Sequence, residues 1–362
     1  HLTHQSLLDK LNELSYTPIT PKPALAPDFS YLAVSLKSML EGKELILATK
    51  PYAKEVRWKS WYFTISTLLI LIVLFAGTVL VPYLLGRIAC SILAGLVLVR
   101  LFVIYHDHQH HSILTKSKLA DWLFTAFGIL ILVPTSIWKR THDYHHAHNS
   151  RLFTASIGSF PIFTKEKYLK CSRPQQIGYL AIRHPITILM GYISVFLYGM
   201  TIQSFLSSPG KHWDSMIAVV LHFAISVLVI IFFGWQVWLI SICIPFAIAC
   251  AMGAYLFYAQ HNFPGVTFKE DIEWSYDHAA LESSSYMEMN FFWKWVTANI
   301  GYHHIHHINS RIPFYRLPEV MAALPELQTA KKTSLNPSDI VACLRLKLWD
   351  PERQMMIGLK QL

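Results

Sequence analysis

The chain has 362 residues, of which 53% are hydrophobic and only 15% are charged. Soluble domains carry about 25% charged residues, so this composition excludes a disordered chain, a collagen-like chain and a small disulfide-stapled scaffold. The formal net charge is +9. In so apolar a chain we expect this charge to lie in loops beside a membrane rather than on a nucleic-acid-binding surface, and we expect no nucleic-acid partner.

The first 60 residues mix polar and apolar side chains and hold four prolines between positions 18 and 27. We expect a loose lead followed by a short amphipathic helix from about Tyr31 to Lys50. The whole chain is then expected to divide into this cytoplasmic lead (1–60), a membrane-embedded core (61–258) and a cytoplasmic cap (259–362).

Six apolar runs form the core, and several are long enough to cross a hydrocarbon layer of about 30 Å. In chain order they are residues 61–85, 88–105, 122–138, 186–206, 216–233 and 235–258. Only Gly86 and Arg87 separate the first two runs, and only Gly234 separates the last two, so each pair is expected to form a tight hairpin. Arg100, near the end of the second run, is expected to extend its charged end to the membrane interface.

Twelve of the 19 histidines fall in three short tracts, at 106–111, 142–148 and 303–307. Side chains three or four positions apart share a helix face, so the spacings HxxxH and HxxHH direct several imidazoles toward one point. One further histidine follows the last apolar run. The candidate metal ligands are His106, His110, His142, His145, His146, His261, His303, His306 and His307. Nine imidazoles exceed the needs of one ion and suit two metal ions with about four nitrogens each.

The other histidines of the tracts are expected to lie outside this ligand set, against a ligand or in solvent. They are His108, His148 and His304. His111 is five positions from His106 and would replace His110 if the helix unwinds there. His222 stands alone in an apolar run and is expected to be packed or hydrogen-bonded. Asp107 and Asp143 fit two interpretations equally, as a helix cap or surface charge, or as a carboxylate that orients a ligating imidazole.

The number of crossings follows from parity. If the three tracts meet at one site, the run at 122–138 lies between two tracts and cannot cross once, so it should lie in the interface or re-enter. An even number of the last three runs must cross, and 186–206 is the least apolar of them. The prediction is therefore an all-α integral membrane protein with four transmembrane helices, in two hairpins, and a cytoplasmic helical cap that carries a histidine-rich two-metal site.

The distribution of charge sets the orientation. Residues 112–185 contain ten Lys and Arg but only three acidic residues. By the positive-inside rule, this segment, both termini and all three histidine tracts are expected to be cytoplasmic.

The three histidine tracts resemble the boxes of membrane fatty acid desaturases. The resemblance rests on HDxxHH at 106–111, HxxHH at 142–146, GYHxxHH at 301–307 and the QH pair at 260–261. The stretches KPYAKE at 50–55, NSRIPFYRL at 309–317 and LRLKLWD at 344–350 are similar to the acyl-lipid omega-6/delta-12 subgroup. The resemblance covers roughly residues 45–352.

The resemblance implies a non-haem di-iron oxidoreductase that uses O2 and two electrons to place a cis double bond in an acyl chain. Its iron ligands would be the nine histidines named above, and purified protein could carry zinc instead, since nitrogen sites favour zinc over ferrous iron. No haem or dinucleotide motif is present in the sequence. Electrons are therefore expected from an external carrier such as ferredoxin or a cytochrome b5-type protein, and the substrate is expected to be an acyl lipid within the bilayer.

Two other functions fit parts of the pattern. A fatty acid or alkane hydroxylase or a carotenoid oxygenase would use the same scaffold, because hydroxylation begins with the same hydrogen abstraction. A divalent-metal transporter would instead place its ligands within the spans, along a path. The histidine boxes lie at or beyond the ends of the apolar runs, which favours an enzyme over a transporter.

Overall fold

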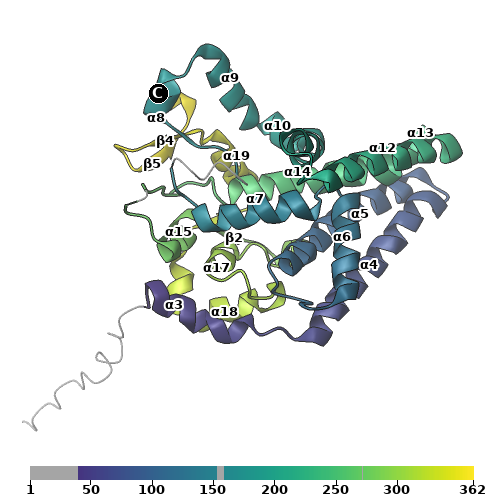
Figure 1. The fold of residues 1–362 in the computed structure, drawn as a ribbon, viewed down its shortest axis with the longest axis horizontal. Helices are drawn as coiled ribbons and strands as arrows, with labels where there is room; N and C mark the ends of the chain where they lie inside the picture. The colour runs from purple at the N-terminus through teal and green to yellow at the C-terminus, as the bar shows by residue number, and fades with distance from the viewer. Residues whose placement is uncertain (1–39, 153–158, 271) are drawn as a thin grey trace, which may run out of the picture. The chain divides into compact units, whose positions relative to one another are not determined.

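The computed structural model describes residues 40–152, 159–270 and 272–362, and within these ranges helices predominate (Figure 1). Residues 31–39 of the predicted helix from Tyr31 to Lys50 lie outside the described residues. Its described part contains α3 (Gly42–Thr49), followed by a 3-10 turn at Lys50–Ala53.

Four helices are long and apolar enough to cross a membrane. They are α4 (Arg57–Leu80), α5 (Leu84–Gln109), α12 (Trp213–Phe233) and the continuous helix Trp235–Ala259. The last comprises α13 (Trp235–Trp238), a π-helical stretch (Leu239–Cys243) and α14 (Ile244–Ala259). These are the four runs that the sequence predicts to span, so the candidate spans are confirmed, whereas their crossing of a bilayer stays a prediction.

The first hairpin turns at a different point from the one predicted. Helix α4 ends at Leu80 and α5 begins at Leu84, so the turn contains Pro82, which has no backbone N–H to donate. Arg87 lies inside α5, and its Nε donates a hydrogen bond to the Thr78 carbonyl at 2.6 Å. The prediction that Gly86 and Arg87 form the turn is therefore wrong, because a single arginine with a local acceptor does not interrupt an apolar helix.

The second hairpin turns where the sequence predicts. Gly234 separates α12 from α13 and has φ of 87°, a left-handed conformation that glycine adopts without strain.

The other two apolar runs are bent or broken. The run at 122–138 divides into α6 (Lys118–Leu130) and α7 (Thr135–His148), which meet at 93°. This geometry is that of a re-entrant or interfacial pair, as parity requires, or of one broken span. The run at 186–206 divides into α10 (Pro185–Leu189), a π-helix (Tyr192–Gln203) and α11 (Ser204–Ser207), and it is not among the candidate spans.

Arg100 does not extend to an interface. Its side chain is buried at 4% exposure, and Nε donates to the Thr67 hydroxyl at 3.1 Å while Nη1 donates to the Trp295 carbonyl. The guanidinium also lies 4.6 Å from the Trp295 ring centre. The expectation that this arginine snorkels is wrong, because carbonyl and aromatic partners from the C-terminal region reach it inside the fold.

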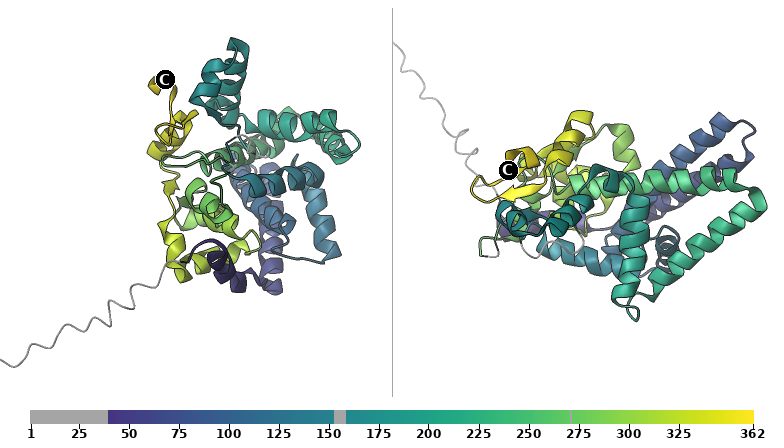
Figure 2. Two further views of the ribbon diagram at one scale, coloured as in Figure 1. Left: turned by 60° about the vertical axis from the view of Figure 1, so that its left-hand side comes forward. Right: turned by 90° about the horizontal axis from the view of Figure 1, so that it is seen from above.

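Short helices and strands build the remaining region, on the opposite side from the outer ends of the long helices (Figures 1 and 2). The helices are α8 (Lys165–Lys170), α9 (Arg173–Ile182), α15 (Tyr276–Ser283), α16 (Phe291–Val296), α17 (His303–Ile308), α18 (Leu317–Ala323) and α19 (Pro337–Arg345), with 3-10 turns at Phe314–Arg316, Pro325–Thr329 and Leu359–Gln361. The strands are β1 (Phe163–Thr164), β2 (Tyr286–Glu288), β3 (Lys332–Ser334), β4 (Leu348–Asp350) and β5 (Met355–Ile357).

The strands connect segments that are far apart in sequence. β1 pairs in parallel with β4, with Phe163 opposite Leu348, and β4 pairs antiparallel with β5. β2 pairs in parallel with β3. The segment that follows the second histidine box and the segment that precedes the third are thereby each paired with the C-terminal region.

The four-span arrangement can be tested with alkaline phosphatase, which is active only outside the cytoplasm. We expect a phosphatase inserted at Gly234 to be active and one fused after Leu362 to be inactive. An active C-terminal fusion would contradict the predicted orientation.

Candidate metal centre

The first histidine box lies at the end of α5. His106 is in the last turn of this helix, and His110 caps it by donating its backbone N–H to the His106 carbonyl at 3.1 Å. His111 follows with φ of 57° and an exposed side chain. The helix therefore stops in time to turn His110 inward and His111 away.

The second and third boxes lie on two short helices. The second box occupies the last turns of α7, and the third fills most of α17. His261 follows the end of α14 and is fixed by a hydrogen bond between Nδ1 and the Ser283 carbonyl at 3.0 Å. That bond places the proton on Nδ1 and leaves Nε2 with a free lone pair.

These elements bring all nine predicted ligand histidines together in two groups. His106, His110, His142, His146 and His306 form the five-histidine group, and His145, His261, His303 and His307 form the four-histidine group. In each group the nitrogens offered all lie within 4.8 Å of one another. Each box contributes to both groups except the first, so the two groups are side by side and share α7 and α17.

The nitrogen spacing suits metal coordination. Nε2 atoms of neighbouring imidazoles are separated by 2.9 Å between His106 and His142, 3.0 Å between His146 and His306, and 2.9 Å between His261 and His303. Two nitrogens bound at about 2.1 Å and at right angles to each other lie about 3.0 Å apart. The histidine groups can therefore hold metal ions, with five and four nitrogens on offer.

Burial lowers the pKa values of His261, His303, His306 and His307 and keeps these imidazoles neutral. Loss of solvent lowers the pKa of His261 to about 4. It holds the pKa values of His303, His306 and His307 well below their usual range, and repulsion by neighbouring imidazoles adds to that effect. A neutral imidazole is the form that binds a metal ion, so the site is prepared electrostatically for a cation.

Several ring nitrogens in the groups have no hydrogen-bond partner in the part of the chain that the structure describes. Five Nδ1 atoms are buried without a hydrogen-bond partner among the described residues, those of His142, His145, His146, His303 and His306. Nine buried imidazoles with converging nitrogens would be costly as a purely structural cluster, because buried polar atoms are normally paired. Ion binding at the converging nitrogens would offset that cost.

The two aspartates that follow the first histidines have different roles. Asp107 is buried, and its carboxylate lies 3.3 Å from Nδ1 of His106 while it accepts the backbone N–H of Phe314 at 2.7 Å. It therefore orients a group member and fastens the segment after the third box. Asp143 is half-exposed and pairs with Lys139 at 3.0 Å, so it is a surface charge.

The other histidines lie outside both groups. His108 pairs with Asp121 at 3.1 Å, and His304 is fully buried with Nε2 3.0 Å from the Leu327 carbonyl. His148 lies 3.0 Å from the Tyr144 carbonyl and stacks on that ring. His222 is buried and hydrogen-bonded to Tyr192, as predicted. The burial of His304 excludes the solvent-exposed alternative, and its place next to a metal ligand stays a prediction.

Left-handed backbone surrounds the histidine boxes. Eight non-glycine residues in the described ranges have positive φ, and seven flank the boxes. They are His111, Leu114 and Lys116 after the first box, Leu132 and Ser150 around the second, and Ala298 and Asn299 before the third. Such conformations persist only where surrounding contacts impose them, and they cluster at functional sites. Nothing in the composition of these stretches predicts them, since none is a glycine.

Apolar cavities run from the histidines between the long helices. One, of about 40 Å³, is lined by His106, His142 and His303 together with side chains of α5 and α14. A second, of about 30 Å³, lies farther along the same helices and shares Val99, Phe102 and Gly253 with the first. Trp138 lines the first cavity and stacks on the His142 ring at a centroid distance of 4.6 Å.

Four candidate spans, two buried histidine groups that can hold metal ions and adjoining apolar cavities are the features expected of a membrane-bound metalloenzyme. The family model for fatty acid desaturases matches residues 82–337. A fatty acid desaturase of Bacillus subtilis is 30% identical over 281 residues, which cover 77% of this chain and 79% of that protein. The chain therefore belongs to the fatty acid desaturase family and is an oxidoreductase, which excludes the transporter alternative.

Two more distant relatives have more specific names. An sn-1 oleoyl-lipid 12-desaturase of Arthrospira platensis is 22% identical, over 80% of this chain and 83% of that protein. An sn-1 acyl-lipid omega-3 desaturase (ferredoxin) of Nostoc is 23% identical, over 62% of this chain and 63% of that protein.

The neighbouring histidines of the first box provide a matched pair of substitutions. We expect His110→Asn to weaken metal retention against a chelator by about tenfold or more, because it removes one nitrogen from the five-histidine group. His111→Asn should leave retention unchanged, since asparagine tolerates the left-handed backbone there. Metal content per purified chain, measured after graded chelation, distinguishes them. Equal retention by both variants, or loss only in His111→Asn, would contradict the grouping.

Proposed function

We propose that this protein is an acyl-lipid desaturase that introduces a cis double bond into a lipid-linked acyl chain. The observation that carries the proposal is the pair of buried histidine groups beside apolar cavities between the long helices. The 12-desaturase name of the Arthrospira relative supports an omega-6/delta-12-like specificity.

The nine grouped histidines would hold two iron ions. His106, His110, His142, His146 and His306 would bind one, and His145, His261, His303 and His307 the other. When bound, the irons supply the oxidation of an unactivated C–H bond by O2, with reduction of the oxygen to water. The donor set is free of sulfur and rich in imidazole, which suits iron and also admits zinc in purified protein.

The residues around the groups would orient and enclose the reacting chain. Asp107 holds the ring of His106 through Nδ1, and the Ser283 carbonyl does the same for His261, so neither ring can rotate away. Val99, Phe102 and Gly253 line both apolar cavities and mark the path along which a methylene chain would lie and exclude water.

The electrons would come from an external carrier at the cytoplasmic face. We infer this face from the basic segment 112–185 and from the positive-inside rule. The Nostoc relative is named as ferredoxin-dependent, which supports a ferredoxin donor, and a cytochrome b5-type protein is the alternative. An acidic carrier would be attracted to the excess of Lys and Arg on this segment.

A hydroxylase or carotenoid oxygenase on the same scaffold remains the second proposal. Desaturation and hydroxylation share the first hydrogen abstraction, and they differ in how the chain lies after it. The named relatives favour desaturation.

The fatty acid profile of host cells tests the activity. The intact chain, expressed with a ferredoxin system, should give a new unsaturated species whose bond position defines the regiochemistry. His306→Ala should abolish it, because a buried member of the five-histidine group is lost, whereas His148→Ala should retain it. Hydroxylated product in place of the olefin would favour the second proposal, and full olefin yield from His306→Ala would contradict the histidine assignment.

A further inference from the structure

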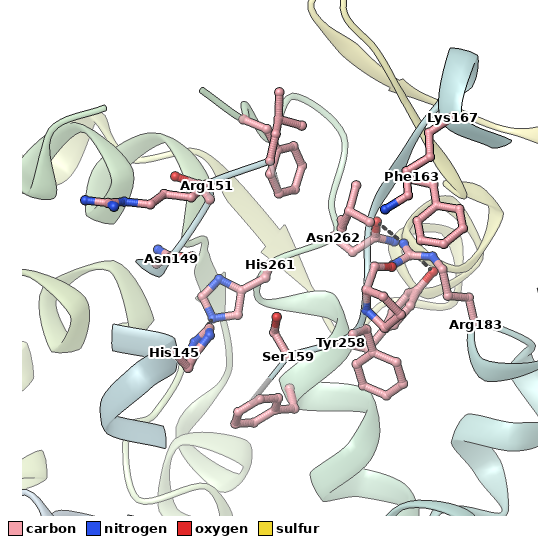
Figure 3. Close-up of a pocket in the computed structure, with 17 residues that line it drawn as sticks. His145, Asn149, Arg151, Ser159, Phe163, Lys167, Arg183, Tyr258, His261 and Asn262 are labelled. Atoms are coloured by element: carbon pink, nitrogen blue, oxygen red, sulfur yellow. Dashed lines mark hydrogen bonds between the residues drawn. The ribbon is translucent and has the colours of Figure 1, made fainter. Parts of the chain in front are cut away.

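A pocket of about 190 Å³, lined by both polar and apolar side chains, opens beside the four-histidine group (Figure 3). His145 and His261 lie at one end, and Arg183, Asn262 and Lys167 lie at the other (Figure 3). Phe257 lines both this pocket and the nearer apolar cavity. The pocket and that apolar cavity therefore meet at Phe257.

Arg183 is a fully buried cation at this end. Its guanidinium donates to the Asn262 side-chain oxygen at 2.7 Å and to the Pro161 carbonyl at 2.8 Å. It also lies 3.2 Å from the Tyr258 hydroxyl. All of these acceptors are neutral, and no carboxylate of the described residues lies within ion-pair distance. Nε has no partner among those residues.

Two further cations accompany Arg183 without an acidic partner in the described ranges. Lys347 donates from Nζ to the Arg183 carbonyl at 2.6 Å, and burial together with the Arg183 charge lowers the pKa of Lys347 to about 8. Lys167 lines the pocket itself, with Nζ 4.2 Å from the Phe163 ring centre. Nearby Glu166 is already paired with Lys170.

This excess of positive charge has a physical cost that the surrounding hydrogen bonds do not remove. A buried charge without a counter-charge is strongly destabilising, and like charges placed together add to the penalty. Hydrogen bonds to Pro161 and Asn262 fix where the guanidinium lies but do not neutralise it. An anion in the pocket would do so. Arginine is also the side chain best suited to two-point binding of phosphate oxygens.

We infer that this pocket binds the phosphate oxyanion of an acyl-lipid head group, with Arg183 and Lys167 as its cationic contacts. The inference rests on the proposed function for its substrate class and adds the recognition of the head group. With the phosphate at the cationic end, the acyl chain would run past His261 and His145 toward Phe257 and the apolar path. Acyl chains on phosphate-free lipids would bind more weakly because Arg183 would stay uncompensated.

The test measures lipid binding and needs no turnover. Purified full-length protein in a neutral detergent is titrated with dioleoyl phosphatidylglycerol, with dioleoylglycerol, which has the same chains and no phosphate, and with inorganic phosphate. Thermal unfolding reports binding, because a ligand that binds the folded state raises its stability. We expect half-saturation by phosphatidylglycerol at a concentration about tenfold or more below that of dioleoylglycerol.

Substitutions on α8 provide a matched pair. Lys167→Glu should raise the half-saturating concentration of phosphatidylglycerol by about tenfold, because it places a negative charge in the pocket. Lys170→Glu makes the same charge change one turn away, outside this pocket, and should shift it by less than about twofold. Arg183→Lys keeps the positive charge but cannot donate two parallel hydrogen bonds. It should weaken the binding of phosphatidylglycerol and leave the binding of dioleoylglycerol unchanged.

The remaining outcomes overturn either this inference or the proposed function, and they distinguish the two. Equal affinity for the two lipids would remove the head-group phosphate as the ligand. Equal weakening by Lys167→Glu and Lys170→Glu would indicate general surface attraction. If inorganic phosphate stabilises the protein and phosphatidylglycerol does not displace it, the pocket would be a site for free anions and not for a lipid head group. Selective phosphatidylglycerol binding without any new olefin in host cells would refute the desaturase proposal alone. An active desaturase indifferent to the phosphate would refute this inference alone.

Discussion

Mutual repulsion and desolvation of nine buried imidazoles constrain everything around them. An imidazole inside the protein stays neutral because charging it requires solvent that is absent, as the lowered pKa values of His261 and its neighbours show. Their nitrogens nevertheless converge to about the spacing expected at a metal ion. Such an arrangement is stable only if a cation is to be bound there or if the surrounding fold holds it by force. In this structure, contacts from the surrounding fold hold the imidazoles in an arrangement that is ready to bind a cation.

The holding forces come mostly from outside the histidine boxes. Asp107 joins the first box to Phe314, beyond the third, and Arg100 joins the same helix to the carbonyl of Trp295, ahead of the third. The third box is thus tied to α5 at two points. The left-handed residues that flank all three boxes are the local consequence, since chain direction has to change sharply wherever a helix must stop to aim a ring.

The side chains that line the cavities beside the histidine groups differ in polarity. The cavities between α5 and α14 are apolar, whereas the pocket beyond Phe257 ends in Arg183 and Lys167. A lipid has the same division between chain and head group. Under the proposed function, the reactive site would lie at the junction of these two environments, and the place of that junction would set which part of the substrate reaches the histidines.

Much of this could be predicted from periodicity and composition, and the exceptions have physical causes. Apolar length gave six candidate runs, and parity reduced them to the four candidate spans. Helical spacing selected eight of the grouped histidines, and the ninth, His261, was selected because it follows the last apolar run. The site of the first turn was wrong because Pro82 interrupts a helix more strongly than a charged Arg87 that finds a nearby carbonyl. The burial of Arg100 and Arg183 could not be predicted, since their partners lie far away in sequence. The choice of His110 over His111 likewise depends on where α5 unwinds, which tertiary contacts decide.

The most direct test of the account is X-ray absorption on the purified chain loaded with ferrous iron under anaerobic conditions, combined with iron quantitation. We expect about two irons per chain, each with nitrogen and oxygen ligands at Fe–ligand distances of about 2.0–2.2 Å and with no sulfur ligand. A single iron per chain, or a sulfur neighbour, would contradict the two-group histidine centre on which the rest of the interpretation depends.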